Sequence, residues 1–315
     1  MLLHILHETR YDYRPAALNA HHLAYLRPLD GPQQQVLRHE LRIDPTPDHQ
    51  QLSRDLYDNQ RLHFDLYRAH GHLHVRAETL VRTGLAQPAL GPGPAWDEVA
   101  RRYHYRVGAV CDAALEFAFA SALAPRAKVF ADFARPSFVP GRPLPEAAWD
   151  LMERLHRHMR YEPHSTEVDT PAAQALVQQR GVCQDFAHIL IACCRSLGLP
   201  ARYVSGYLLT DPPPGQARLI GSDASHAWAS VYCPALSDRA EIDPSQPGQW
   251  LDLDPTNRRS PGQDYVTLAV GRDYADLSPL RGVIRGAIEH ALSVAVTVTA
   301  WEDAVPAPKE VRPAS

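Results

Sequence analysis

The chain has 315 residues, of which 45% are hydrophobic and 22% are charged, which is enough apolar material for two domains. Its formal net charge of -4 argues against a protein that binds nucleic acid or anionic membranes through charge. No apolar run approaches the roughly 18 residues of a membrane span, and His4, His7 and Glu8 interrupt the start too early for a secretory signal. We therefore expect a cytoplasmic protein with neither a membrane nor a nucleic-acid partner.

The cysteines indicate free thiols. There are five, an odd number, and no pair of them has C-x-x-C spacing. This pattern argues against a disulfide framework and against a zinc ribbon, so we expect reduced cysteines, no structural metal and no cofactor. The five are Cys111, Cys183, Cys193, Cys194 and Cys233.

The first part of the chain has the pattern of short β-strands. Segments rich in β-branched and aromatic residues, many of them alternating, occur at 3–13, 22–26, 35–43, 61–67 and 72–81, with turns of Pro, Asp and Asn between them. This spacing predicts a β-sandwich over residues 1–90. His70, His72 and His74 alternate on one strand face, but no cysteine or carboxylate joins them at ligand spacing, so we expect a solvent-facing polar face rather than a metal site.

Helical patterns follow a proline- and glycine-rich linker at 86–96. Helices are predicted at 113–123, at 145–159 and from Cys183 to a glycine stop at Gly198, and strands at 201–209, 226–232 and 250–253. Helices that lead into an antiparallel sheet predict an α+β fold, with a second domain, the core, over 91–286. His156, His158 and His164, near the end of the second helix, are expected to be exposed residues rather than ligands.

Cys183 is the strongest candidate for a nucleophile. It opens a helix whose apolar stripe consists of Phe186, Ile189, Leu190, Cys193 and Leu197. Unpaired backbone N–H groups and the positive end of the helix dipole favour a thiolate at that position. Gly181 is expected to provide the backbone freedom with which the chain enters this helix. A buried structural thiol is the alternative interpretation of a single cysteine, and we expect it for Cys193.

His226 and Asp254 can complete a catalytic triad with Cys183. Alternation places His226 and Trp228 on one face of a strand, and Asp254 ends the next strand just before a proline turn. In such a triad the imidazole exchanges protons with the thiol and the carboxylate orients the imidazole. Asp252 would point the same way along its strand and is the alternative carboxylate.

These motifs resemble the transglutaminase-like superfamily of papain-fold cysteine enzymes. The resemblance implies catalytic roles for Cys183, His226 and Asp254, and it favours Asp254 over Asp252 because the orienting Asp directly precedes Pro-Thr. The N-terminal residues also resemble the β-domain of a bacterial branch of that superfamily, except that Asp58 stands where a glycine is expected. The matching segments are Gly181-Val182-Cys183, His226-Ala227-Trp228, Asp254-Pro255-Thr256-Asn257, Tyr11-x-Tyr13, Leu26-Arg27-Pro28, Asp55-x-x-Asp58-Asn59 and Gly271-Arg272-Asp273-Tyr274.

The remainder of the active site is less defined by the sequence. The backbone N–H of Cys183 is one expected oxyanion donor, and Gln178, Gln179 and Gln184 are side-chain candidates for the second. Trp228 is a candidate for substrate binding. Asp185 and His188 lie one helical turn apart, so that they can pair with each other or line the cleft.

The pattern predicts acyl transfer from an amide through a Cys183 thioester. Hydrolysis of a peptide or protein substrate is favoured, because the sequence has no acidic calcium loop of the EF-hand type that would indicate a metal-gated cross-linking enzyme. An amine-accepting transglutaminase and a non-catalytic peptide-binding module are the alternatives. The oligomeric state is open.

A last strand is predicted at 292–301, where hydrophobic residues alternate with small and polar ones. Such a strand needs a partner, and we expect it to return to the N-terminal domain, with residues 287–315 forming this strand and a tail. An added edge strand on the catalytic sheet is the alternative.

Overall fold

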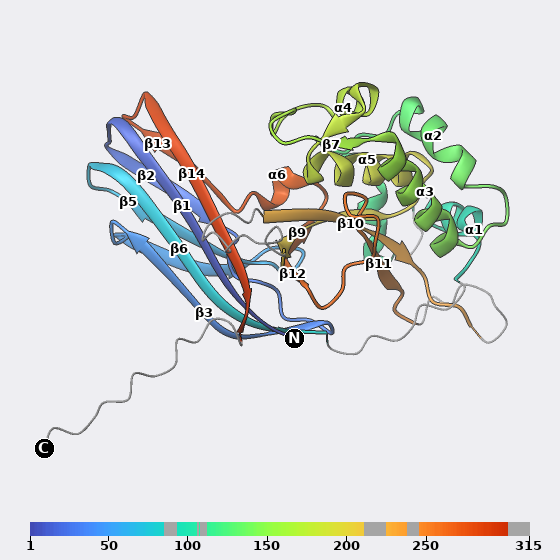
Figure 1. Cartoon of the computed structure of the whole chain (residues 1–315), viewed down its shortest axis with the longest axis horizontal. Helices are drawn as coiled ribbons and strands as arrows, with labels where there is room; N and C mark the ends of the chain where they lie inside the picture. The colour runs from blue at the N-terminus through green and yellow to red at the C-terminus, as the bar shows by residue number, and fades with distance from the viewer. Residues whose placement is uncertain (85–92, 106, 108–111, 211–224, 238–245, 302–315) are drawn as a thin grey trace, which may run out of the picture.

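A computed structural model describes residues 1–84, 93–105, 107, 112–210, 225–237 and 246–301. In these residues a β-sandwich lies beside a second domain in which helices cover one face of a sheet (Figure 1). The predicted α+β class is confirmed. The expected linker at 86–96 falls mostly outside the described residues, and its last residue, Trp96, already begins a helix. No helix in the described part of the chain is long and apolar enough to cross a membrane.

Two four-stranded antiparallel sheets form the sandwich. Their strand orders are β14-β1-β6-β3 and β13-β2-β5-β4. The strands of the first sheet are β1 (Leu2–Ala17), β3 (Gln34–Asp44), β6 (His70–Thr83) and β14 (Glu289–Ala300). The strands of the second sheet are β2 (Asn19–Ala24), β4 (His49–Arg54), β5 (Gln60–Leu66) and β13 (Leu280–Arg285).

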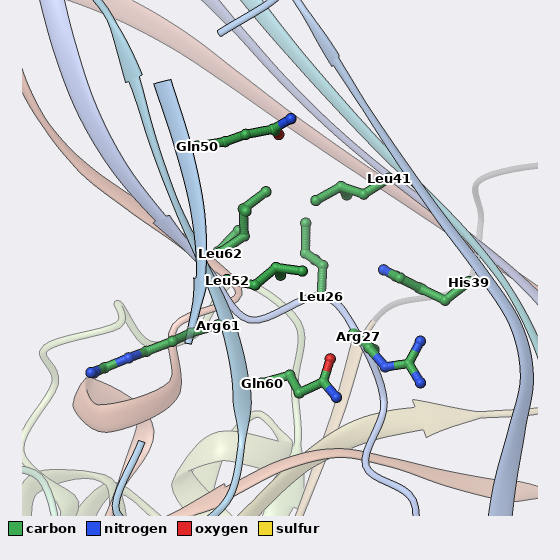
Figure 2. A pocket seen from close by; sticks show the side chains of 10 residues that line it. Leu26, Arg27, His39, Leu41, Gln50, Leu52, Gln60, Arg61 and Leu62 are labelled. Carbon is green, nitrogen blue, oxygen red and sulfur yellow. The ribbon is translucent and has the colours of Figure 1, made fainter. Parts of the chain in front are cut away.

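The sandwich has the alternation that its sequence predicts, with two added strands, β4 and β13. Phe64, Leu73 and Val75 are fully buried between the sheets, as expected for inward-facing strand positions. The strand β4 was not predicted, because it is a polar edge strand with little apolar alternation to reveal it. At the edge formed by β3 and β4, four leucines converge on a cavity of about 460 Å³ (Figure 2); they are Leu26, Leu41, Leu52 and Leu62.

The last two strands of the described chain belong to the sandwich. The strand β14 lies antiparallel to β1, with Leu3 opposite Ala300 and Arg14 opposite Glu289, so the first and last strands are neighbours (Figure 1). The strand β13 pairs with β2. The expectation that the catalytic segment runs to residue 286 therefore needs correction, since its sheet ends with β12 and the chain returns to the sandwich from residue 280.

The second domain is built around one helix and one sheet. The sheet has the order β11-β10-β9-β12, with strands β9 (Ala201–Leu208), β10 (Ser225–Cys233), β11 (Gln249–Leu253) and β12 (Tyr265–Gly271). The helix α5 (Cys183–Ser196) packs on β9 and β10. The other short elements are α1 (Trp96–Arg102), η1 (Ala113–Ala118), α2 (Lys128–Ala134), η2 (Arg135–Ser137), α3 (Leu144–His158), β7 (Arg160–Tyr161), α4 (Ala172–Gln178), β8 (Arg180–Gly181) and α6 (Tyr274–Leu277).

The helices agree with the sequence where the apolar period is long. The predicted helices at 145–159 and at Cys183 are α3 and α5, and Gly198 follows α5 with a φ of 82°, as a glycine C-cap predicts. The helix predicted at 113–123 is wrong, because only a 3₁₀ turn forms at Ala113–Ala118. The expected single stripe on α5 is also wrong. Every residue from Asp185 to Arg195 is buried, since α2, α3 and α4 contact this helix and the sheet covers another side.

The two domains share an interface along β12. The side-chain amide of Gln34 accepts from the Thr267 N–H at 2.7 Å and donates to the Thr267 carbonyl at 2.7 Å. Asn59 does the same to Val270, donating at 2.7 Å and accepting at 2.8 Å. Two amides of the N-terminal domain thus satisfy the backbone at the free edge of the second domain's sheet, as a neighbouring strand would do.

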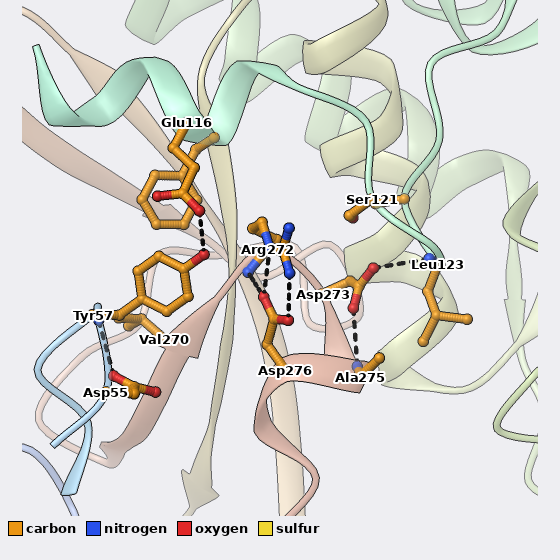
Figure 3. Close-up of polar contacts among 12 residues, drawn as sticks. Asp55, Tyr57, Glu116, Ser121, Leu123, Val270, Arg272, Asp273, Ala275 and Asp276 are labelled. Carbon is orange, nitrogen blue, oxygen red and sulfur yellow. Dashed lines mark hydrogen bonds and ion pairs between the residues drawn. The ribbon is translucent and has the colours of Figure 1, made fainter. Parts of the chain in front are cut away.

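Motifs that resemble the bacterial branch meet at this interface (Figure 3). Tyr57, in the turn before Asn59, donates to Glu116 at 2.7 Å. Asp273 accepts from the Leu123 N–H at 2.8 Å, while Arg272 pairs with Asp276. Asp58, where a glycine is expected, has a φ of 66°. That left-handed conformation favours glycine and explains the expectation.

Candidate active site

Cys183 is the first residue of α5 and is partly exposed. The helix start is capped by Asp185, whose carboxylate accepts from the Val182 N–H at 2.8 Å and from the Thr166 hydroxyl at 2.6 Å. Burial raises the pKa of Asp185 above its usual value, and these hydrogen bonds partly offset that effect. The thiol therefore lies at the N-terminal end of a capped helix, beside backbone N–H groups that have no acceptor within the helix.

Gly181 is needed for space rather than for backbone freedom. Its φ is not positive, but a Cβ atom there would lie 2.6 Å from a carboxylate oxygen of Asp185. The expected reason for this glycine was therefore wrong. The carboxylate that caps α5 packs directly against the residue two positions before Cys183, and only a glycine leaves it room.

His226 lies on β10 between Cys183 and Asp254. Its Nε2 atom is 2.7 Å from Oδ2 of Asp254, and its side chain is 10% exposed. Burial disfavours the charged imidazolium, but hydrogen bonds to Asp254 and Cys183, together with their charges, outweigh burial and raise the pKa of His226 to about 10. The imidazole is therefore protonated at neutral pH and faces the thiol.

Asp254 is fully buried and receives a dense set of hydrogen bonds. Its Oδ1 atom accepts from the backbone N–H groups of Thr256 and Asn257, at 2.9 and 3.2 Å. Its Oδ2 atom accepts from the Asn257 amide at 2.8 Å and from the Tyr265 hydroxyl at 2.7 Å. Burial alone would raise the pKa of Asp254, but hydrogen bonds from His226, Asn257 and Tyr265 lower it below its usual range. The carboxylate thus stays charged.

Asp252 lies beside a different set of groups. It is opposite Ser230 in the β10–β11 register and accepts a hydrogen bond from the Ser230 hydroxyl. Burial raises the pKa of Asp252, and the charge of Arg202 partly offsets this. The hydrogen bond to His226 is made by Asp254, and no hydrogen bond between Asp252 and His226 is found among the described residues.

The glutamine candidates lie at different places around the start of α5. Gln184 donates to the Val168 carbonyl at 2.9 Å. Gln178 ends α4, and Gln179 follows it in a left-handed conformation with a φ of 55°. No distance in the structure selects one of the three as an oxyanion donor, so that role stays a prediction.

Trp228 is buried beside the imidazole of His226 and does not line an open cleft. It is 1% exposed, and its ring centroid lies 6.2 Å from that of His226 and 5.5 Å from that of Tyr265. A Cβ atom on Gly206 of β9 would lie 2.5 Å from the Trp228 ring. The absence of a side chain at Gly206 is what lets the indole lie across the neighbouring strand.

Asp185 and His188 do not pair with each other. Asp185 caps the helix, and the Nε2 atom of His188 accepts from the Tyr274 N–H at 3.2 Å. Both side chains are buried, at 1% and 2% exposure, so neither lines a cleft. The sequence suggested two alternatives for this pair, and both are wrong because α5 is covered on this face by other parts of the chain.

Three other histidines, His70, His156 and His158, are more buried than the sequence predicts. His72 and His74 lie near the carboxylates of Asp44 and Glu8, at 3.0 and 3.3 Å, whereas His70 is buried. His156 and His158 are partly buried and bond to backbone carbonyls, so the expectation that they are exposed is wrong. Within the described residues, no group of three or more His, Cys, Asp or Glu side chains has the arrangement of a metal site.

Sequence reasoning missed two tyrosines near the site. Tyr161 on β7 is half exposed, and burial together with the charge of Cys183 raises its pKa. Tyr265 begins β12 and contacts both His226 and Asp254. The short run of apolar and β-branched residues at 265–271 could have predicted the strand β12, but only the folded sheet brings its first residue to Asp254.

Comparison with known proteins identifies the family of this chain. Residues 134–255 match the transglutaminase-like superfamily, and residues 3–82 match the bacterial transglutaminase-like N-terminal region. The chain belongs to the transglutaminase-like superfamily. An uncharacterized protein of Mycobacterium tuberculosis is 39% identical over 303 residues, which is 95% of this chain and 92% of that protein.

Two further similarities are more distant. This transglutaminase-like chain superimposes on the crystal structure of a proposed cysteine protease from Cytophaga hutchinsonii with a TM-score of 0.69 and 19% sequence identity. The match covers 95% of this chain and 90% of that protease chain. A protein-glutamine gamma-glutamyltransferase of Pseudomonas aeruginosa is 30% identical over 173 residues, which is 50% of this chain and 23% of that protein. The first similarity shows a shared fold.

Proposed function

We propose that this protein is a cysteine-dependent enzyme that cleaves amide bonds of a peptide or protein through a thioester on Cys183. One observation carries the proposal: the hydrogen-bonded series Cys183, His226 and Asp254 begins at the N-terminus of a long buried helix. Membership of the transglutaminase-like superfamily and the fold shared with a proposed cysteine protease support it.

The first half of the reaction transfers the acyl group to sulfur. The Cys183 thiolate attacks the amide carbonyl carbon, so a carbon–sulfur bond forms and the carbonyl oxygen becomes an oxyanion. Backbone N–H groups in the first turn of α5 have no acceptor within the helix and are suited to stabilise that charge. Protonated His226 gives its proton to the leaving nitrogen as the carbon–nitrogen bond breaks, which leaves a thioester and a free amine.

The second half releases the acyl group. Neutral His226 takes a proton from water, the oxygen attacks the thioester, and the carbon–sulfur bond breaks to give a carboxylic acid and the starting thiolate–imidazolium pair. Because Nε2 of His226 is bonded to Asp254, Nδ1 is the nitrogen left to exchange protons with Cys183 and water. Asp254 thus determines which ring nitrogen works as acid and base.

An amine is the alternative acceptor for the thioester. The similarity of half of this chain to a protein-glutamine gamma-glutamyltransferase favours this second candidate. The chemistry of the first half is the same, and only the group that attacks the thioester differs. Hydrolysis remains our primary proposal, and both outcomes can be measured in one experiment.

The test uses the full chain and a Cys183→Ala variant with a library of peptide amides that includes glutaminyl peptides. Mass spectrometry should find a cleaved or deamidated product without added amine, an acyl adduct on Cys183 after acid quench, and neither with Cys183→Ala. A product found only with added amine would identify a transferase. Reactive Cys183 with no turnover and no adduct would indicate a peptide-binding module.

A further inference from the structure

Asp254 is bonded by a residue from another strand that the proposed mechanism does not use. The hydroxyl of Tyr265 lies 2.7 Å from Oδ2 of Asp254, and the same oxygen lies 2.7 Å from Nε2 of His226. Tyr265 is the first residue of β12 and is 4% exposed. A single carboxylate oxygen therefore receives both the imidazole and a buried phenol.

A second contact determines the direction of the hydrogen bond from Tyr265. Nε of Arg259 donates to the Tyr265 oxygen at 3.1 Å, and the guanidinium lies 4.7 Å from the centroid of the Tyr265 ring. Because a guanidinium can donate but cannot accept, the one hydroxyl proton of Tyr265 is directed to Asp254. Arg259 is held in turn by an ion pair with Asp264.

Packing holds the Tyr265 ring in this position. The ring meets Trp228 edge-on, with 5.5 Å between the centroids and 88° between the planes, and its centroid lies 5.9 Å from that of the His226 imidazole. Its strand, β12, is hydrogen-bonded to β9, which pairs with β10, the strand of His226 (Figure 1). Tyr265 therefore contacts the imidazole on one side and the carboxylate at its hydroxyl.

We infer that Tyr265 is a positioning residue, which holds the Asp254 carboxylate in the orientation that receives His226 and is itself oriented by Arg259. This inference rests on the proposed function of the Cys183, His226 and Asp254 site. It gives the β12 strand a direct part in arranging the reacting groups, although Tyr265 does not contact the reacting carbon.

Loss of the Tyr265 hydrogen bond would change how the reactivity of Cys183 depends on pH. The groups that face Asp254 are His226 from β10, Tyr265 from β12, and Asn257 with the nearby Arg259 from the turn after β11. The Tyr265 hydrogen bond is one of the contacts that lower the pKa of Asp254. Without that bond the carboxylate takes up a proton at a higher pH, and the imidazolium beside Cys183 loses its partner.

The test compares Tyr265→Phe with Tyr207→Phe in the full chain. Tyr207 is a matched control, because its buried hydroxyl bonds His7 at 2.9 Å, away from Asp254. The rate of Cys183 alkylation by iodoacetamide is measured from pH 3 to 9, with folding checked by circular dichroism. For Tyr265→Phe we expect the acid side of the profile to move upward by roughly half to one pH unit, and for Tyr207→Phe no movement.

The alkylation measurement needs no substrate, so it stays informative even if the amide-cleavage proposal fails. If an amide substrate is found, kcat of Tyr265→Phe should fall about tenfold or more with little change in KM. A folded Tyr265→Phe whose profile superimposes on that of the wild type would overturn the inference. If Tyr265→Phe does not fold, the same measurement is made with Arg259→Met, a substitution at a partly exposed position. We expect the acid side of its profile to move upward as well, by a smaller amount. An unmoved profile for Arg259→Met would overturn the inference.

Discussion

At the scale of single residues, exposure separates Cys183 from the cysteines deeper in its own helix. Cys193 and Cys194 are fully buried, and burial raises the pKa of the Cys194 thiol to about 12. Brief treatment with iodoacetamide at neutral pH should therefore label Cys183 and leave these two unmodified, as peptide mass spectrometry can show. Cys183→Ser should remove the label. Comparable labelling of Cys193 in the folded wild type would contradict the prediction.

The two nearby carboxylates should differ strongly in their effect on turnover. Asp254→Asn keeps the size of the side chain but removes the charge that orients His226, so kcat should fall by about 10³- to 10⁴-fold. Asp252→Asn, which alters a carboxylate beside Ser230 and Arg202, is the matched control and should change kcat by less than about tenfold. Steady-state kinetics on any amide substrate found for the wild type would decide this. A larger loss in Asp252→Asn would mean that the wrong carboxylate was chosen.

At the scale of elements, β12 joins the two domains. Its free edge is satisfied by side-chain amides of Gln34 and Asn59, and its first residue bonds Asp254. A strand edge would otherwise present unpaired N–H and carbonyl groups. The N-terminal domain therefore stabilises the sheet of the second domain at β12, the strand that also contains Tyr265.

Gln34→Ala should weaken this junction measurably. The substitution leaves the Thr267 N–H and carbonyl and the Leu29 carbonyl without the amide that bonds them, so the free energy of unfolding should fall by about 2–4 kcal/mol. Gln35→Ala, at the exposed neighbouring position, should change it by less than about 0.5 kcal/mol. Urea unfolding monitored by fluorescence would measure both. Equal stabilities of the two variants would show that the amide contacts contribute little.

At the scale of the whole molecule, the strand β14 closes the chain on itself. It pairs with β1 over most of its length, and Val296 and Val298 belong to the same buried apolar cluster as Tyr207 and Val266 from the sheet of the second domain. This one strand therefore contributes to the sandwich and to the contact between the domains. A chain that ends before β14 therefore lacks the edge strand of the first sheet of the sandwich.

A chain that ends at Ala287 should aggregate or lose hydrogen-exchange protection in β1 and β6. Removing β14 exposes the edge of β1 and uncovers apolar side chains of the first sheet. Protection of α5, in the other domain, should be much less affected. A chain ending at Trp301 is the control and should behave like the full chain. Undiminished protection of β1 in the shorter chain would refute the prediction.

Buried histidines should make the whole molecule sensitive to acid. Burial lowers the pKa of His7 to about 4, and burial, with smaller charge effects, lowers that of His22 to about 4, below the value of 6.5 for an exposed histidine. Their contribution to stability is present above pH 6.5 and is lost as the pH falls towards 4, because the unfolded chain binds protons that the folded chain cannot. The free energy of unfolding should fall by about 1.4 kcal/mol per pH unit for each histidine.

Urea unfolding at several pH values between 7 and 4.5 would measure this slope. His7→Gln should be less stable at pH 7 and should show a shallower fall, since one titrating group is gone. Parallel curves for the wild type and His7→Gln would contradict the prediction. His226 acts in the opposite direction: its pKa is raised to about 10, so its contribution is present below pH 6.5 and is lost as the pH rises towards 10.

Local patterns in the sequence were sufficient for the three elements that carry the candidate triad and for the order of its residues. The helix at Cys183, the strand at His226 and the Asp-Pro turn at Asp254 are each recognisable from neighbours within a few residues, because helix starts, strand alternation and proline turns are local properties. The same holds for the strand β14, whose alternation is long and regular.

Tertiary structure alone decided what those elements contact. The sequence around Tyr265, Gln34 and Asn59 does not distinguish them from other residues. Tyr265 reaches Asp254 only because the strands of the sheet are paired. Gln34 and Asn59 bond residues of β12 that lie more than 200 positions away in the sequence, and they do so only because the two domains are packed together. The burial of α5 on all sides, and the place of β13 in the sandwich, likewise depend on which elements pack against them. The period of the hydrophobic residues indicates whether a segment is a helix or a strand. A buried hydrogen bond between distant segments depends on how the whole chain folds.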